Sequence, residues 1–290
     1  MRIGIFPNLV KEESAPLVHE LMELCLQYQV DFYLPEDVRN GKQSIFKEIP
    51  EAHLKPRGII FNSIDVAMVL GGDGTILKLS REFAGRGVPI CGVNIGSLGF
   101  LYEVETESLE NRLKDILEGR FFIEERMMLQ ADLCLEDGSV QIMPEALNDI
   151  VVGHGNVGKL IRLDMYINHD FIQQYPCDGI IISTPTGSTG YTFSSGGPIV
   201  APSAPCLMVT PICPHLLLKV PLILSDTDRV SFTAANNRNS IRISVDGMVD
   251  LEFTKDMTLH IRKSDRTLKL MRFNKNYFYK NLFTKLMGTK

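Results

Sequence analysis

The sequence predicts an α/β domain with a parallel sheet, followed by a second, mainly antiparallel β domain. In the first third of the chain, short apolar runs alternate with stretches of helical period, as in repeated βα units. From about Ile123 onward, short strands follow one another, separated by Gly, Asn and Asp turns. A chain of 290 residues is long enough for two domains with ordinary hydrophobic cores.

The first domain is expected to begin with a strand and then to alternate helices with strands. Between residues 35 and 58, mixed charge, three prolines and the lack of a clean period predict a loosely structured connection. Gly119 is expected to close the last helix of the domain. The expected strands are Arg2–Phe6, Val30–Leu34, Asp65–Leu70 and Pro89–Val93, and the expected helices are Ala15–Tyr28, Ile76–Phe83 and Ser108–Leu117.

The second domain is expected to consist of short strands without intervening helices. The tail, Asn276–Met287, again has a helical pattern with a Tyr, Phe and Leu face, and it is expected to pack on the first domain. The expected strands are Leu129–Leu135, Asp149–Val152, Leu160–Asn168, Gly179–Ser183, Arg229–Thr233 and Ser240–Val245.

The composition argues against several classes of protein. A net charge of −5 argues against a general nucleic-acid binder, which normally carries a basic face. Six cysteines without a C-x-x-C pair indicate a reducing compartment and no zinc site. The amino terminus enters a strand at once, and no apolar stretch is long enough to cross a bilayer. We therefore expect a cytoplasmic protein that binds neither nucleic acid nor membranes.

The most informative local feature is Gly71-Gly72-Asp73-Gly74-Thr75, which follows the apolar strand pattern of Val66–Leu70. Three glycines around one carboxylate suit a backbone that approaches a polyanion closely while it presents one acid. A tight strand-to-helix turn usually needs one glycine, and the Rossmann fingerprint spaces its glycines differently, as G-x-G-x-x-G. The segment therefore predicts a phosphate site with Asp73 as a candidate base. The glycine segment Asn94–Leu101 also follows a strand, at the edge where ligands gather in parallel sheets.

A second glycine-rich segment, Gly153–Leu160, nearly matches the P-loop pattern. Leu160, however, stands where a magnesium-binding Ser or Thr is required, and the residues that follow alternate like a strand instead of opening a helix. We therefore predict a β-hairpin turn here, with Lys159 still within reach of a phosphate.

A third segment, Asp178–Pro198, places a dense set of hydroxyls and glycines after a strand. A flexible linker is the alternative interpretation. Pro185, Tyr191 and Phe193 oppose it, because they stiffen or anchor the chain. The pattern favours an ordered loop for a polar, aromatic ligand such as a nucleotide.

Taken together, these segments resemble the successive motifs of the NAD kinase family. The glycine-aspartate loop alone also occurs in diacylglycerol and sphingosine kinases and, in related form, in phosphofructokinases. Residues 184–191, together with the Asn148-Asp149 pair, resemble the NAD kinases only. The motifs that carry the resemblance are Gly71–Thr75, Asn94–Leu101, Ala146–Asp149, Asp178–Pro198, Thr210–His215 and Ser244–Gly247.

The resemblance implies an architecture of an α/β domain, a β-sandwich-like domain and a carboxyl-terminal segment that returns to the first domain. We accordingly expect the α/β domain, with the phosphate loop, at residues 1–123 and 265–290. The β-rich, NAD-binding domain is expected at residues 124–264. The resemblance also implies a homo-oligomer, either a dimer or a tetramer.

The resemblance further implies transfer of the terminal phosphoryl group of ATP to the 2′-hydroxyl of the adenosine ribose of NAD. ATP would enter with Mg²⁺ or another divalent cation, and no protein metal ligands are assigned. Asp73 matches the family's proposed catalytic base. The positions that match the family's substrate-binding residues are Gly72, Gly74, Thr75, Phe100, Asn148, Asp149, Asp178, Thr186, Thr189, Tyr191 and Ser194.

The chain departs from the family pattern at several positions. Asp149 stands where Glu is usual, which shortens the reach of the carboxylate by one methylene, and Gly190 stands where Ala is usual. The pair Pro176-Cys177 replaces residues that often include a basic one. Two alternative functions remain open at this point: a lipid kinase that uses the glycine-aspartate loop, and a non-catalytic dinucleotide sensor.

Overall fold

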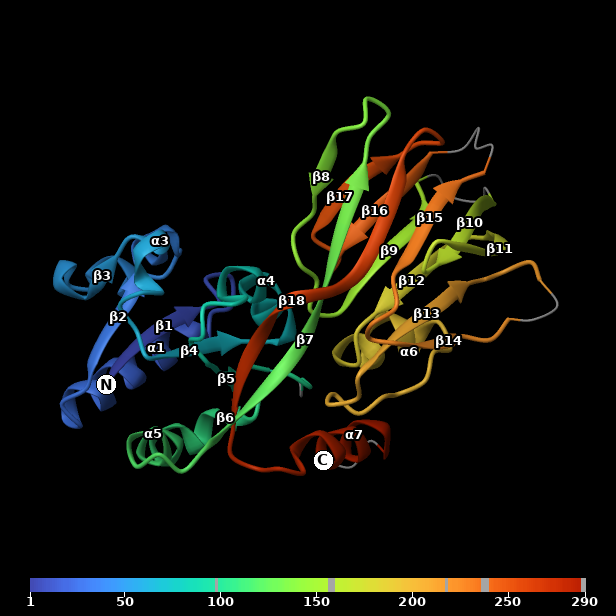
Figure 1. The fold of residues 1–290 in the computed structure, drawn as a ribbon. Helices are drawn as coiled ribbons and strands as arrows, with labels where there is room; N and C mark the ends of the chain where they lie inside the picture. The colour runs from blue at the N-terminus through green and yellow to red at the C-terminus, as the bar shows by residue number, and fades with distance from the viewer. Residues whose placement is uncertain (97–98, 156–159, 217–218, 236–239, 288–290) are drawn as a thin grey trace. The chain divides into compact units, whose positions relative to one another are not determined.

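The chain divides into two compact units in a computed structural model that describes residues 1–96, 99–155, 160–216, 219–235 and 240–287 (Figure 1). Unit 1 comprises Met1–Glu125 and Leu268–Lys290, and unit 2 comprises Arg126–Thr267. Unit 1 is an α/β domain and unit 2 is mostly β, so the predicted fold class is confirmed, with the C-terminal segment returning to unit 1. Ser97 and Leu98 of the glycine segment Asn94–Leu101, and the predicted turn residues Asn156–Lys159, lie outside the described residues.

The sheet of unit 1 is parallel, in the order β5-β4-β1-β2-β3, and β6 pairs with β5. Strand β4 lies between β5 and β1 and is buried along its whole length, which explains its unbroken apolar sequence. Because Pro7 pairs with Leu70 and Gly71 pairs with Asn94, the carboxyl ends of β1, β4 and β5 meet at one edge. The strands are β1 (Arg2–Pro7), β2 (Asp31–Pro35), β3 (Leu54–Lys55), β4 (Val66–Gly71), β5 (Ile90–Asn94) and β6 (Val104–Glu105).

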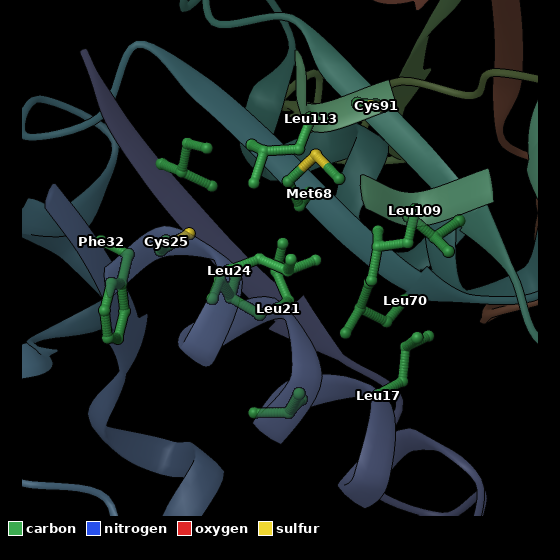
Figure 2. Close-up of a cluster of buried hydrophobic side chains, with 14 of the residues drawn as sticks. Leu17, Leu21, Leu24, Cys25, Phe32, Met68, Leu70, Cys91, Leu109 and Leu113 are labelled. Atoms are coloured by element: carbon green, nitrogen blue, oxygen red, sulfur yellow. The ribbon is translucent and has the colours of Figure 1, made fainter. Parts of the chain in front are cut away.

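Helices pack their apolar stripes on this sheet. In α1, residues Leu17, Leu21 and Leu24 repeat at helical spacing and belong to the same buried cluster as Met68 and Leu70 of β4 (Figure 2). Gly119 has φ +71°, as expected for the residue that ends α5. The helices of unit 1 are α1 (Ser14–Gln27), α2 (Ile45–Glu48), α3 (Arg57–Ile60), α4 (Asp73–Phe83), α5 (Leu109–Leu117) and α7 (Tyr277–Met287), with 3₁₀ turns η1 (Glu36–Asn40), η2 (Glu51–His53) and η3 (Thr106–Ser108).

The prediction of a loose connection between residues 35 and 58 was wrong. The segment folds into η1, α2, η2 and β3, and α3 begins at Arg57. Val38 and Phe46 are buried, at 2% and 0% exposure, and anchor the segment to the core of unit 1. Elements of two to five residues are too short to produce a readable hydrophobic period, so the sequence pattern could not reveal them.

Unit 2 contains an antiparallel sheet in the order β14-β13-β12-β9-β16-β17. In a second sheet, β11, β10, β15 and β18 pair in that order, and these pairings are also antiparallel. A cluster of buried aliphatic and aromatic side chains draws on strands of both sheets. Strands β7 and β18 have residues in both units. The strands are β7 (Phe122–Cys134), β8 (Val140–Ile142), β9 (Asp149–His154), β10 (Ile161–Ile167), β11 (Asp170–Cys177), β12 (Gly179–Ser183), β13 (Cys206–Ile212), β14 (Leu222–Ser225), β15 (Val230–Ala234), β16 (Ile241–Val245), β17 (Val249–Phe253) and β18 (Thr258–Arg272).

The prediction of a β-hairpin turn at Gly153–Leu160 was also wrong. The flanking strands β9 and β10 do not pair with each other, because β9 pairs with β12 and β16 while β10 pairs with β11 and β15. The segment therefore connects strands of different sheets. An alternation of polar and apolar residues identifies a β-strand, but it does not show with which other strand that strand pairs.

All six cysteines lie in the described part of the chain and are free thiols. Within the described residues, no helix has both the length and the apolar character that crossing a bilayer requires.

Candidate active site

The glycine-aspartate loop lies where strand β4 passes into helix α4. Strand β4 ends at Gly71, Gly72 precedes the helix with extended backbone, and α4 begins at Asp73, three residues earlier than its apolar pattern indicated. Asp73, Gly74 and Thr75 therefore form the first turn of the helix. The Thr75 N–H donates to the carbonyl of Gly72 at 2.6 Å, whereas the first N–H groups of a helix have no partner further back in the helix. A helix start of this kind attracts anions through its N–H groups and its dipole.

The Asp73 carboxylate is held by the backbone of the glycine segment Asn94–Leu101. Its Oδ2 accepts a hydrogen bond from the N–H of Phe100 at 2.8 Å, and its Oδ1 accepts one from the N–H of Leu101 at 3.0 Å. A Cβ atom at position 99 would overlap the carboxylate, so only glycine allows this approach. These contacts fix Asp73 in a single orientation beside the helix start.

Tyr102 fixes the loop from another side. Its side chain is buried at 1% exposure, and its hydroxyl donates to the carbonyl of Gly72 at 2.8 Å. Burial raises the pKa of Tyr102 above its ordinary value, which keeps the hydroxyl protonated as a donor.

A cavity of about 460 Å³ opens beside the loop, lined by residues 72–75 together with residues that follow β1. Three cationic side chains line it: Lys11, Lys78 and Arg57. Lys11 also donates to the carbonyl of Ile95, and it lies 3.7 Å from where a Cβ of Gly72 would be. Cationic side chains beside a helix start suit a ligand with several phosphates.

Neighbouring groups position the lining of this cavity. The guanidinium of Arg57 contacts both carboxylate oxygens of Glu82, at 2.8 and 2.9 Å, and Asp37 at 2.8 Å. The amide of Asn8 donates to the hydroxyl of Thr75 at 3.0 Å. Arg57 is therefore already paired with carboxylates, whereas Lys11 lies directly beside Gly72 of the loop.

A second group of candidate residues lies in unit 2 around Tyr191. Asn148, Asp149 and Tyr191 line a cavity of about 360 Å³, together with Ser244 and residues 246–247. A cavity of about 310 Å³ shares Tyr191 and Ser244 and adds Asp178, His154 and Arg242. The Tyr191 side chain is 47% exposed, so its ring offers a free surface for stacking.

Asp246 holds the Asn148-Asp149 pair in place. The Asp246 carboxylate accepts hydrogen bonds from the backbone N–H groups of Leu147, Asn148 and Asp149, at 2.9, 2.8 and 3.0 Å. The Asp149 side chain itself is only 7% exposed. Its burial, and then the charge of Asp246, raises the pKa of Asp149 to about 7.

The hydroxyl-rich segment after β12 is ordered and packs against the same pair. It forms the 3₁₀ turn η4 (Thr186–Thr189) and the short helix α6 (Tyr191–Ser194). The Thr184 hydroxyl donates to the carbonyl of Leu147 at 2.6 Å, and a Cβ on Gly187 would run into the backbone of Asn148. The prediction that this segment is an ordered loop and not a flexible linker is therefore confirmed. A Cβ at position 190 would meet ordinary contacts, at 3.4 Å from the carbonyl of Gly187 and 3.6 Å from Asn148 Nδ2.

Comparison with known proteins assigns these features to a family. Residues 3–121 match the model of the ATP-NAD kinase N-terminal domain, and residues 147–273 match that of the ATP-NAD kinase C-terminal domain. The chain belongs to the NAD kinase family. Among its relatives, the NAD kinase of Natranaerobius thermophilus is 34% identical over 286 residues, covering 99% of this chain and 98% of that protein. The NAD kinase of Syntrophotalea carbinolica is 35% identical over 292 residues, covering 98% of each.

Two solved structures share the fold. The yeast NADH kinase complexed with NADH has a TM-score of 0.89 at 26% identity, covering 100% of this chain and 88% of that one. The NAD kinase from Archaeoglobus fulgidus in complex with ATP has a TM-score of 0.78 at 26% identity and full coverage of both chains. As an NAD kinase, the chain is a phosphotransferase.

The structure brings most of the predicted NAD kinase positions into these sites. Gly72, Asp73, Gly74 and Thr75 line the cavity of unit 1, and Phe100 contributes its N–H to Asp73. Asn148, Asp149, Asp178 and Tyr191 line the cavities of unit 2.

Like Phe100, three further predicted positions lie outside those cavity linings. The Thr186 hydroxyl is buried and accepts a hydrogen bond from Arg126 Nη1 at 3.2 Å, and the Thr189 hydroxyl donates to the Thr186 carbonyl at 3.4 Å. Ser194 is exposed at the end of α6.

Sequence reasoning missed several side chains that line or hold the NAD kinase sites. Lys78 lies four residues after Gly74 on α4, and that spacing on one helix face was a usable signal. Asn8 and Lys11 follow β1, at the sheet edge where the glycine loop lies. The alternation of strands and helices in the sequence could have indicated that position. The bracing role of Asp246 was not readable, because it depends on the pairing of β16 with β9.

Proposed function

We propose that this NAD kinase transfers the terminal phosphoryl group of MgATP to the 2′-hydroxyl of the adenosine ribose of NAD, which gives NADP. The observation that carries the proposal is the Asp73 carboxylate, fixed by two backbone N–H groups at the rim of a cavity lined with cations. Phosphoryl transfer needs alignment, charge stabilisation and one group that accepts the hydroxyl proton. Asp73 takes that proton in this proposal.

The donor phosphates are assigned to the cavity of unit 1. The helix start at Gly72 and Gly74 offers N–H groups, Thr75 offers its hydroxyl, and Lys11 and Lys78 offer positive charge. The divalent cation is assigned to the substrate, since Mg²⁺ in such reactions is held largely by phosphate oxygens and water. Within the described residues, no three His, Cys, Asp or Glu side chains gather as metal ligands.

The NAD acceptor is assigned to the cavities of unit 2. Tyr191 offers a face for a base, Asn148 offers both a donor and an acceptor, and Asp149 and Asp178 suit ribose hydroxyls. Phe100, Thr186, Thr189 and Ser194 complete the proposed NAD-binding set. The NADH bound to the yeast relative and the ATP bound to the archaeal relative support these two ligand classes.

The family resemblance also supports a dimer or a tetramer, and light scattering measures the mass of the assembly directly. The six free thiols support a reducing, cytoplasmic location.

Product analysis tests the proposal. The protein is incubated with MgATP and NAD, NADP is measured with an NADP-specific dehydrogenase, and ³¹P NMR locates the new phosphate on the ribose. NADH as acceptor and polyphosphate as donor define the substrate range, while diacylglycerol and sphingosine test the lipid-kinase alternative. A folded preparation that makes no NADP from any of these donors would refute the proposal.

A further inference from the structure

The loop that holds Asp73 is itself held by the C-terminal segment of unit 1. Asn281, on helix α7 (dark red in Figure 1), donates from its side-chain amide to the carbonyl of Gly99. Arg272, at the end of β18, donates to the carbonyl of Leu101 at 3.0 Å and approaches that of Phe100 at 3.5 Å. Both side chains are buried, at 4% and 3% exposure.

The contacts to the carbonyls of Gly99 and Phe100 fall on the two peptide groups that donate to Asp73, whereas the Leu101 carbonyl belongs to the peptide group that follows them. The carbonyl of Gly99 and the N–H of Phe100 belong to one peptide plane, so Asn281 holds the oxygen end while the N–H end donates to Asp73 at 2.8 Å. The carbonyl of Phe100 and the N–H of Leu101 form the next plane. Because a trans peptide points its C=O and N–H in opposite directions, each plane lies between the C-terminal segment and Asp73.

The surrounding contacts make this arrangement rigid. The Asn281 amide also contacts the Tyr277 hydroxyl at 3.2 Å, and the Arg272 guanidinium lies 5.3 Å from the Tyr277 ring centre. Arg272 Nε donates to Glu124 at 2.7 Å. The Phe100 ring lies 6.1 Å from that of Phe278 on α7. The C-terminal segment therefore holds residues 99–101 through several contacts.

We propose that Asn281 is a positioning residue for the phosphoryl transfer, acting on Asp73 through the Gly99–Phe100 peptide group, with Arg272 doing the same through the next peptide. The proposal rests on the proposed function, in which Asp73 is the base. A hydrogen bond to a peptide oxygen polarises the group and strengthens its N–H as a donor. Asn281 thus sets both the position of the Phe100 N–H and the strength of its hydrogen bond to the Asp73 carboxylate.

Asn281 is the better residue to change. Arg272 is a buried cation paired with Glu124, and its removal would leave an unpaired buried charge that destabilises the unit on its own account. Asn281→Asp keeps the shape of the side chain but removes the donor and sets a negative oxygen against the Gly99 carbonyl.

The expected result is a split between turnover and binding. Since a displacement of about 1 Å away from the chemistry can cost about 100-fold, kcat of Asn281→Asp should fall by about 10- to 100-fold. The KM values for NAD and ATP should stay within about twofold, because the variant leaves the ligand-contacting groups in place. Phe283→Ala, an exposed side chain on the same helix, is the matched control and should keep kcat.

A double-mutant cycle distinguishes an effect of Asn281 that acts through Asp73 from a general disturbance of the structure. In the Asp73→Asn background, Asn281→Asp should lower the residual rate by less than about twofold, because the partner through which it acts is already gone. Full additivity, or a normal kcat in Asn281→Asp, would overturn the inference. If Asp73→Asn alone retained normal kcat, the proposed base would fail instead, which keeps the two failures distinguishable.

A neutral variant covers the case in which Asn281→Asp fails to fold. Asn281→Ser places no charge in the buried site and should give the same loss of kcat with unchanged KM. In ¹⁵N-labelled protein the amide proton of Phe100 should move upfield, because its hydrogen bond to Asp73 weakens. An unchanged Phe100 amide together with an unchanged kcat would overturn the inference.

Discussion

Asp149 offers a prediction that depends only on the environment of one side chain. It is 7% exposed and lies near the carboxylate of Asp246, and these surroundings raise its pKa to about 7 from the ordinary 3.8. The Asp149→Asn substitution removes the titrating proton while it keeps the shape of the side chain. Comparing the variant with the parent therefore isolates this one group.

The sign and size of the effect follow from proton linkage. Between about pH 4 and pH 7, the unfolded chain releases the Asp149 proton while the folded chain retains it, so the folded state loses stability as the pH rises. Each pH unit in this window is worth about 1.4 kcal/mol. The unfolding free energy of Asp149→Asn, minus that of the parent, should rise by about 3 kcal/mol between pH 5 and pH 8, and it should level off above the folded pKa.

Urea unfolding at a series of pH values measures this difference. The chain has no tryptophan, so the transitions are followed by circular dichroism. Carbon-13 NMR of the Asp149 carboxyl group gives an independent titration of the folded protein. If the two stability curves ran parallel from pH 5 to pH 8, Asp149 would be ionised throughout and its proposed environment would be wrong.

The remaining predictions concern binding and turnover. Asn148→Ala and Tyr191→Ala should each weaken NAD binding, by about 1–3 kcal/mol where a buried polar partner is left unsatisfied; unchanged calorimetric affinities in both would move the NAD site elsewhere. Asp149→Glu should lower kcat/KM, because a longer acid in this buried position overpacks it by about 1–3 kcal/mol; a clear gain would show that the pocket has room for it. Gly99→Ala should lower kcat sharply, since its Cβ would displace the Asp73 carboxylate; normal turnover would show that the loop adapts.

Part of this fold could be predicted because some signals are local. The strand Val66–Gly71 is apolar throughout and ends in glycines, so both its burial and the site that follows it were readable. Helices α1 and α5 carry clear helical periods, and Gly119 marks the end of α5. In each case the physical cause lies within a single window of the sequence.

The rest depends on partners far apart in the chain. Strand neighbours are such a case, which is why the Gly153–Leu160 segment was misread as a hairpin. Asp246 reaches the backbone of residues 147–149 across about a hundred positions, and Asn281 reaches Gly99 across an even longer separation. No sequence window contains both partners, so these supports of the site emerge only from the fold.

The most direct test of the central claim is to compare NADP formation by the parent protein and by Asp73→Asn, with MgATP and NAD, while calorimetry measures NAD binding by both. The account predicts that the parent makes NADP and that the variant binds NAD with similar affinity. The variant's kcat should be lower by about 10²–10⁴-fold, the usual contribution of a positioned base. Near-normal kcat in Asp73→Asn, or no NADP from a folded parent protein, would contradict the account.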